Sequence, residues 1–337
     1  MPLDYRKPRM FLVTGGTGFL GSALVRGLVA KGQRVRTLDN DTRGRRSRLA
    51  DLGPAVDVRI GDIRDPATVA EAVAGVDCVC HLAYINGTEF FYSIPETVLD
   101  VGVRGMLNIL DACRHHGVRD LVLASSSEVY QDAAVVPTNE TVPLIVPDPL
   151  NPRYSYGGGK IISELLAINY GRKSFERVAI FRPHNIFGPD MGWEHVIPQF
   201  ALRGSFLARN HPHGVLDFPI KGNGTATRAF MPIDDFVAAA LCVIDVGEHL
   251  GIYHIGVESE ITVAELASRV GQCLGRLIRI VPSDPPRGEA RRRCPDTHKL
   301  RSLGFRPQVD FMTALKSTVD WYAANTAVAP DRVVKSL

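Results

Sequence analysis

Short apolar segments alternate with longer amphipathic segments along the first half of the chain. The apolar segments have the length of buried strands, whereas the longer ones repeat their apolar residues at helical spacing. Such alternation is typical of a parallel sheet covered by helices on both faces. We predict strands at 10–13, 34–38, 56–60, 78–82, 121–125 and 177–182, and helices at 23–30, 67–74, 96–116 and 155–171.

The alternation weakens after Gly188-Pro189, where Pro and Gly become more frequent and the elements shorter. We therefore expect a doubly wound α/β sheet followed by a smaller C-terminal α+β lobe. The sheet domain is expected to span residues 1–185, completed by 228–256. The lobe is expected to use mostly residues 186–337, interleaved with the sheet domain.

A glycine-rich turn separates the first predicted strand from the first predicted helix. Gly15, Gly18 and Gly21 have the spacing G-x-x-G-x-x-G, which permits a tight turn, close approach of a ligand and close helix packing. Backbone amides and the positive helix end then face a pyrophosphate. The turn predicts a Rossmann-type dinucleotide site.

Asp39 ends the second predicted strand, where a carboxylate can accept hydrogen bonds from both adenosine ribose hydroxyls and repel a 2′-phosphate. This position favours NAD over NADP. Arg43, Arg45, Arg46 and Arg48 follow, and one of them could reach a 2′-phosphate. We interpret the four arginines instead as a solvated basic loop.

Composition excludes several classes of protein. The chain has 337 residues and is therefore long enough to bury a large core. Its net charge of +3 is close to neutral, so the protein as a whole has no strong positive potential to attract nucleic acid or an anionic membrane. Residues 1–10 are polar and no apolar stretch approaches a membrane span, so we expect a cytoplasmic protein. The six cysteines lack metal-ligand spacing, which predicts buried thiols and no metal.

Tyr156 and Lys160 stand four residues apart near the start of a predicted helix, so their side chains share one face. A phenol ionises near pH ~10, and a neighbouring ammonium is expected to lower that pKa. Tyr156 is therefore a candidate base. Taken alone, such a pair is more often a surface lysine beside a half-buried tyrosine.

Polar residues also gather where predicted strands end, at 62–63, 81–83, 125–128 and 182–185. Ligands of doubly wound sheets lie beyond the carboxyl ends of the strands, so we expect these residues to share one crevice. With these motifs the chain resembles the extended short-chain dehydrogenase/reductase group, in its nucleotide-sugar epimerase/dehydratase branch. The resemblance covers nearly the whole chain and is carried by residues 14–21, 39–40, 61–62, 81–83, 125–130, 156 with 160, 182–189, 222–235 and 291–295.

The resemblance implies a tightly bound NAD that is regenerated in each cycle. By the same resemblance, Asp62 and Ile63 are expected to border the adenine of NAD. Leu82 and Ala83 are expected to line the cofactor, and Lys160 to hold the nicotinamide ribose. The implied cofactor-binding residues are Gly15, Gly18, Phe19, Leu20, Gly21, Asp39, Asn40, Asp62, Ile63, Leu82, Ala83, Ser125, Tyr156, Lys160 and Pro183.

The resemblance also implies a reaction. Ser126 is expected to hydrogen-bond the sugar 4-hydroxyl while Tyr156 removes its proton and the C4 hydride passes to NAD. The 4-keto sugar can then regain hydride on the other face, lose water across C5 and C6, or lose a C6 carboxylate. The implied catalytic residues are Tyr156, Lys160, Ser126, Ser127 and Glu128.

The pair Ser127-Glu128 bears on which outcome occurs. Glucose-type 4,6-dehydratases have Asp-Glu here, Ser-Glu looks more like mannose-type dehydratases and glucuronate decarboxylases, and 4-epimerases usually lack the Glu. We therefore favour a dehydratase or decarboxylase. The alternatives are a 4-epimerase, a 4-keto-sugar reductase and a non-catalytic dinucleotide sensor. Glu128 can also be structural, capping Val129-Tyr130 or pairing with an arginine.

Two features depart from the family pattern. Gly102 stands where the family commonly has Asn, which predicts a lost or replaced polar contact. Gly157, Gly158 and Gly159 separate Tyr156 from Lys160, and each costs a helix about 1 kcal/mol relative to Ala. One explanation is that the cofactor or another part of the backbone approaches these glycines closely. The other is that a well-packed helix tolerates their cost.

The implied partner is a nucleotide-diphosphate sugar. Arg228 and Arg293 are expected at the phosphates, because guanidinium groups match phosphate oxygens, although a solvated loop is the alternative at 291–293. A homodimer is implied through the helices at 96–116 and 155–171. The predicted substrate-binding residues are Thr88, Ser127, Glu128, Asn185, His195, Arg228 and Arg293, of which His195 has a structural alternative.

Overall fold

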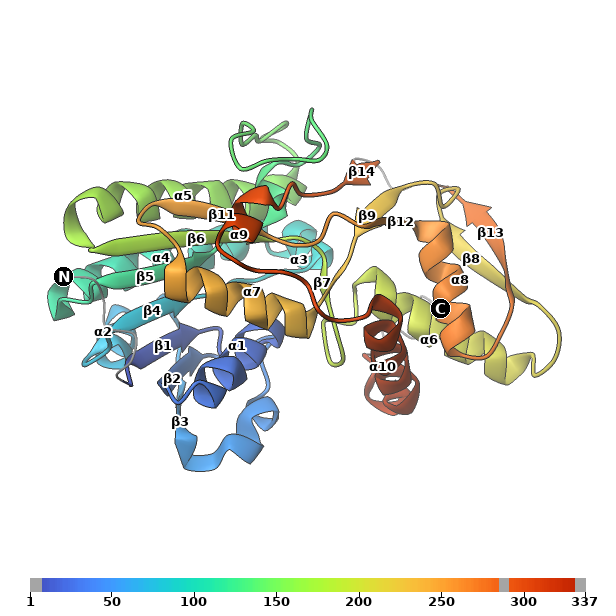
Figure 1. Ribbon diagram of the computed structural model, residues 1–337, viewed down its shortest axis with the longest axis horizontal. Helices are drawn as coiled ribbons and strands as arrows, with labels where there is room; N and C mark the ends of the chain where they lie inside the picture. Colours follow the sequence, from blue (N-terminus) through green and yellow to red (C-terminus); the bar gives the residue numbers. More distant parts are fainter. Residues whose placement is uncertain (1–7, 285–290, 331–337) are drawn as a thin grey trace.

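A computed structural model describes residues 8–284 and 291–330. Its main feature is a seven-stranded sheet in the order β11-β6-β5-β4-β1-β2-β3, with every neighbouring pair parallel (Figure 1). The order reverses between β1 and β4, which is where such sheets bind ligands. The strands are β1 (Met10–Thr14), β2 (Arg34–Asp39), β3 (Val56–Ile60), β4 (Cys78–His81), β5 (Asp120–Ala124), β6 (Arg177–Pro183) and β11 (Gly251–Ile255).

The sheet is buried on both faces, as its apolar runs predict, except at the edge strand β3, where Val58 and Ile60 are exposed. Phe11 and Val13 of β1 point into one core, while Leu12 between them points into the other. The first core is closed by α1 (Phe19–Ala30) and α7 (Ile233–Val246). The second is closed by α2 (Pro66–Val73), α4 (Pro95–His116) and α5 (Ser155–Ser174). The predicted α/β fold class is thus confirmed.

Local sequence explains where these helices start and stop. Pro66 occupies the first turn of α2, and the Asp65 side chain accepts a hydrogen bond from the Ala67 amide. Gly117, at φ 67°, ends α4 in the left-handed conformation that favours glycine. Helix α1 begins at Phe19, earlier than predicted, because the last glycine of the turn is already helical.

A buried ion cluster lies at the amino ends of the strands, away from their carboxyl ends. Asp120 Oδ2 accepts hydrogen bonds from Arg9 Nη2 at 2.8 Å and from Arg177 Nη2 at 2.7 Å. Arg177 Nε donates to Asp120 Oδ1 at 2.9 Å, and the Asp120 side chain is fully buried. The cluster ties the segment before β1 to β5 and β6.

A smaller lobe lies at the other end of the molecule around a third core (Figure 1). The chain enters it after β6, returns to the sheet for α7 and β11, and leaves again. The domain limits stay a prediction. The lobe contains β7 (Ile186–Phe187) paired with β10 (Met231–Pro232), β8 (Leu216–Lys221) with β13 (Ile278–Ser283), β9 (Thr227–Ala229) between β12 (Glu260–Thr262) and β14 (Arg292–Arg293), and α6 (Val196–Asn210), α8 (Val263–Cys273) and α10 (Phe311–Ala324).

Within the described ranges, no helix combines the length and apolar character needed to cross a bilayer. The same residues contain no cluster of three or more His, Cys, Asp or Glu side chains able to hold a metal ion. The cysteines are free thiols, and burial raises the pKa of Cys113 to about 12. Cys78, Cys80, Cys113 and Cys294 are buried as expected, whereas Cys242 and Cys273 are partly exposed.

Candidate active site

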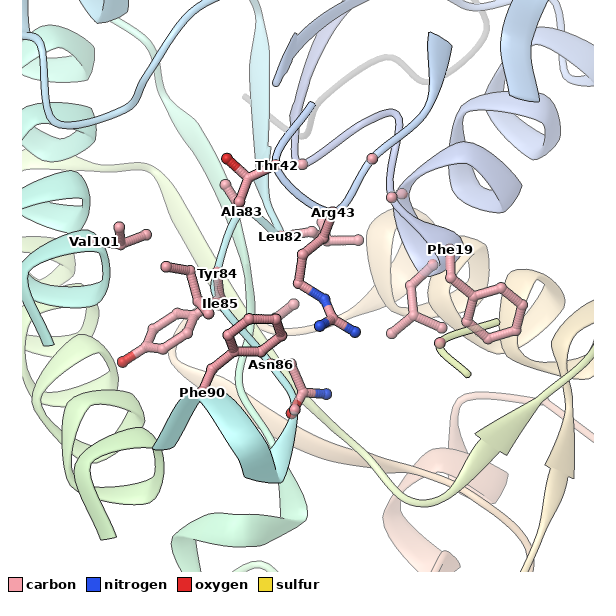
Figure 2. A pocket seen from close by; sticks show the side chains of 18 of the residues that line it. Phe19, Thr42, Arg43, Leu82, Ala83, Tyr84, Ile85, Asn86, Phe90 and Val101 are labelled. Carbon is pink, nitrogen blue, oxygen red and sulfur yellow. The ribbon is translucent and has the colours of Figure 1, made fainter. Parts of the chain in front are cut away.

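A cavity of about 1080 Å³ lies at the carboxyl ends of the central strands and extends to the lobe. Figure 2 shows its wall, with Tyr84 and Phe90 on one side and Phe19 on the other. Residues from all four predicted strand-end segments meet in this cavity, as the topology predicts, although His81, Arg182 and His184 are not part of its lining. Of the predicted site residues, the structure places all but Arg228 along its lining.

The glycine turn has no space for side chains. Gly15 has φ +69°, and its amide donates to Leu38 O at 2.9 Å. A Cβ at Gly21 would lie 2.0 Å from Gly15 O, a backbone atom that cannot move aside. Gly18 precedes α1 without a side-chain cap, and the first turn has no acidic residue. These features fit a dinucleotide pyrophosphate.

We expect Gly21→Ala to abolish retention of the dinucleotide during purification, because the added methyl group forces the turn apart. The 260 nm absorbance of the purified protein measures the bound nucleotide. Gly158→Ala is the matched control, since its Cβ meets only Val146 at 3.5 Å. Equal nucleotide content in the two variants would contradict the assignment of the turn.

Asp39 holds the position predicted for a ribose ligand, at the end of β2. Its carboxylate is buried, and it accepts hydrogen bonds from the Thr17 amide at 3.1 Å and the Asp41 amide at 3.0 Å. The two amides fix the carboxylate at the cavity wall. Asp62 is fixed similarly by Arg64, whose hydrogen bond is the largest influence lowering the pKa of Asp62 to about 2.

The interpretation of residues 43–48 as a solvated basic loop is wrong for Arg43 and Arg48, whose side chains are partly buried, whereas Arg45 and Arg46 are exposed. Arg45 and Arg48 both form ion pairs with Asp190, the latter at 2.7 Å. Arg43 reaches into the cavity, 4.8 Å over the Phe90 ring and 3.4 Å from Glu194 (Figure 2). Sequence patterns did not indicate Asp190 and Glu194 as partners, because both lie more than 140 residues away from these arginines.

Tyr156 projects from the first turn of α5 into an aromatic cage. Its ring stacks on Phe91 at 4.9 Å between centroids and meets Tyr84 edge to face at 5.1 Å. Burial raises the pKa of Tyr156 despite a lowering hydrogen bond with Ser126, and the charge of Glu128 raises it further. Desolvation of the phenol therefore outweighs the lowering that the sequence predicted, and the pKa of Tyr156 lies above its ordinary value.

Groups from other elements hold the Lys160 ammonium. Its Nζ donates to Ala124 O at 2.6 Å and lies 4.1 Å from the centre of the Tyr84 ring. The distance from Nζ to the centre of the Tyr156 ring is 5.9 Å. Burial lowers the pKa of Lys160 to about 7, although the charge of Glu164 raises it.

Residues 126–129 form a tight turn at the end of β5. Ser126 Oγ accepts a hydrogen bond from the Glu128 amide at 3.1 Å. The Glu128 carboxylate forms an ion pair with Arg293. Burial alone would raise the pKa of Glu128, but the guanidinium groups of Arg293, Arg153 and Arg228 outweigh it and hold that pKa below its ordinary value. Glu128 is thus ionised and paired with an arginine.

The remaining predicted residues occupy different parts of the site. Arg228 is buried in β9, where Nη1 donates to Thr227 O at 2.8 Å, and only its charge reaches the cavity. Asn185 lines the cavity and Nδ2 donates to Ala229 O at 3.1 Å. Ser125 donates to the buried Glu164, so its hydroxyl is already committed.

Sequence analysis missed several cavity residues. Tyr84 directly follows the 81–83 strand end and could have been found by extending that motif by one residue. Phe90 and Phe91 lie in the short helix α3 (Thr88–Ser93), which carried no sequence signal. Glu194 lies outside the motifs that indicated the site, and Arg43 had been interpreted only as part of the basic loop.

A family model described as the NAD dependent epimerase/dehydratase family matches residues 11–256. UDP-glucuronic acid decarboxylase 1 from Arabidopsis thaliana is 30% identical over 319 residues, covering 93% of this chain and 70% of that protein. The match therefore includes both the sheet and the lobe.

Two solved structures are similar along their whole length. A dTDP-glucose 4,6-dehydratase from Streptomyces venezuelae, solved with NAD bound, is 32% identical with a TM-score of 0.82, covering 96% of this chain and 99% of that chain. A UDP-glucose 4-epimerase from Thermotoga maritima, solved with UDP-glucose, is 26% identical with a TM-score of 0.82 and covers 94% and 99%.

Proposed function

The chain belongs to the NAD-dependent epimerase/dehydratase family, and we propose that it modifies a nucleotide-diphosphate sugar through a 4-keto intermediate. It is an NAD-dependent enzyme, and its relatives include decarboxylases, dehydratases and epimerases. Among these outcomes we favour loss of water across C5 and C6 or loss of a C6 carboxylate.

One observation carries the proposal: Tyr156, Lys160, Ser126 and Glu128 line the same cavity as the glycine turn. Bound NAD supplies the acceptor for the hydrogen that leaves C4 and later returns it. The protein residues then have to orient the sugar, move the hydroxyl proton and, for C5 chemistry, move a second proton. A non-catalytic sensor needs none of these side chains.

Tyr156 is the residue we assign to the 4-hydroxyl proton. Its hydrogen bond with Ser126 favours the phenolate, whereas burial opposes it. The phenol therefore needs a cation nearby to act as a base at neutral pH. Lys160, whose ammonium lies 5.9 Å from the Tyr156 ring, is assigned to this task. Ser126 is placed to orient both the phenol and the sugar hydroxyl.

Glu128 is the residue we assign to the C5 proton. A ketone at C4 acidifies the C5 hydrogen, so a carboxylate can remove it. The lowered pKa keeps Glu128 ionised, which is the form a base requires. Its ion pair with Arg293 also supports the alternative function, a 4-epimerase in which Glu128 is structural.

Product mass tests the overall proposal. The protein is incubated with a panel of nucleotide sugars, and the masses of the products are measured. Loss of water identifies a dehydratase and loss of carbon dioxide a decarboxylase. An unchanged mass with altered chromatographic retention identifies an epimerase. No conversion of any sugar in the panel would argue against the proposed function.

For Glu128→Gln we expect solvent deuterium incorporation at C5 to fall by ~10²-fold or more, because the amide cannot accept the proton. Mass spectrometry of the recovered sugar measures the incorporation. Glu194→Gln is the matched control. Glu194 lines the same cavity and also pairs with an arginine, Arg43, so this variant likewise neutralises a paired carboxylate. Undiminished exchange in Glu128→Gln would favour the epimerase.

We also propose a homodimer through α4 and α5. The helices pack against each other, and Leu99, Ile162 and Leu165 are exposed on them at 37%, 39% and 55%. Paired exposed apolar positions on adjacent helices are typical of an interface. Sedimentation equilibrium should give the mass of two chains. A cytoplasmic location stays a prediction from the sequence.

A further inference from the structure

Tyr84 lines the cavity but is not one of the residues that we assign to the reaction. It follows β4, and its ring lies beside Phe90 in the cavity wall (Figure 2). Its hydroxyl is buried and has no hydrogen-bond partner among the described residues. Burying a hydroxyl without a hydrogen-bond partner costs free energy of folding. A favourable contact made by another part of the Tyr84 side chain, its ring, can offset this cost.

Two glycines create the space for this hydroxyl. A Cβ at Gly102 in α4 would lie 2.1 Å from Tyr84 Oη, and a Cβ at Gly159 in α5 would lie at the same distance. Any larger residue at either position would therefore displace the phenol. The absence of Asn at position 102 and the glycine before Lys160, both unusual in the sequence, have one explanation: they make room for Tyr84.

The ring that occupies this slot is oriented toward the proposed catalytic pair. Lys160 Nζ lies 4.1 Å from the ring centroid, and the ring meets Tyr156 at an interplanar angle of 84°. An aromatic face is electron-rich and attracts an ammonium group. Lys160 is thus held between the Tyr84 ring and the Ala124 carbonyl oxygen.

We propose that Tyr84 is a positioning residue for Lys160, with its ring face stabilising the ammonium in the slot that Gly102 and Gly159 leave open. The inference rests on the roles proposed above for Tyr156 and Lys160. The other titratable groups acting on Lys160 are Glu164 and Tyr156 from α5 and His81 from β4. None of them is altered in the variants that follow.

The direct test is an NMR titration of Lys160 in the NAD-containing protein, grown with lysine labelled at Cε. The signal missing from Lys160→Met assigns the residue. Tyr84→Leu keeps an apolar side chain but removes the ring face, so we expect the pKa of Lys160 to fall by about one unit. Tyr84→Phe keeps the ring and should leave the titration unchanged.

Gly102→Ala provides an independent test with Tyr84 intact. Its methyl group displaces the phenol, so the Lys160 titration should shift in the same direction as in Tyr84→Leu. Because both changes act on one contact, the double variant should shift no further than Tyr84→Leu alone. Should Tyr84→Leu not fold, Tyr84→Met makes the same comparison.

Turnover gives a second readout. We expect kcat to fall about tenfold in Tyr84→Leu with little change in KM, and to recover in Tyr84→Phe. Unchanged Lys160 titrations in both Tyr84→Leu and Gly102→Ala would overturn the inference, as would an equal shift in Tyr84→Phe. If wild-type protein converts no nucleotide sugar, the proposed function fails, but the titration still decides the role of Tyr84.

Discussion

Tyr156→Phe is expected to lower turnover by ~10²–10⁴-fold while leaving the bound NAD in place. The substitution removes only the hydroxyl that we assign to proton transfer. The ring keeps its stacking on Phe91 and its edge contact with Tyr84, so the cavity retains its shape. Product formation with the substrate that the wild type converts, together with nucleotide content, measures the two effects separately.

Tyr154→Phe is a matched control, because it removes a phenol two residues away that does not line the cavity. Its turnover should stay close to that of the wild type. Near-normal turnover of Tyr156→Phe would refute the assignment of the base. Loss of NAD from this variant would instead show that the hydroxyl serves cofactor retention.

Asp120→Ala is expected to lower the free energy of unfolding by about 3–5 kcal/mol, the usual cost of removing one partner of a buried ion pair. The substitution leaves Arg9 and Arg177 buried without the carboxylate that bonds both. Urea denaturation followed by circular dichroism measures the change. Because the cluster lies at the amino ends of the strands, turnover of the folded fraction should be nearly unchanged.

Asp57→Ala provides the comparison for the stability measurement. Asp57 pairs with Arg36 at 2.7 Å and with Arg59 at 3.1 Å, but its side chain is 42% exposed. Exposed pairs contribute about 0–1 kcal/mol, so this variant should unfold nearly as the wild type does. If the two aspartate variants lose equal stability, burial is not what makes the Asp120 cluster strong.

Much of the fold follows from the sequence because parallel strands buried on both faces leave continuous apolar runs. Residues 10–14 and 121–124 illustrate this, since neighbouring side chains enter different cores and all must be apolar or paired. The same topology brings the strand ends into one crevice, which explains why the motifs after β1, β2, β4, β5 and β6 meet in the cavity.

The electrostatics of the site could not be predicted from spacing. Their spacing of four residues places Tyr156 and Lys160 on one face of the helix. The groups that hold the Lys160 ammonium come from elsewhere: the Ala124 carbonyl oxygen from β5, and the ring of Tyr84, the residue after the 81–83 motif. The pKa of Tyr156 depends on how completely these elements exclude water. Likewise, Arg48 meets Asp190 only when the lobe packs over the β2 loop.

The glycine slot has a consequence for the history of this protein. The tyrosine at position 84 and a side chain at position 102 or 159 exclude each other, because the tyrosine hydroxyl occupies the volume that the Cβ would need. A side chain gained at position 102 or 159 is therefore penalised for as long as tyrosine stands at position 84. Among descendants of a common ancestor, tyrosine at the first position should be inherited together with glycine at the other two.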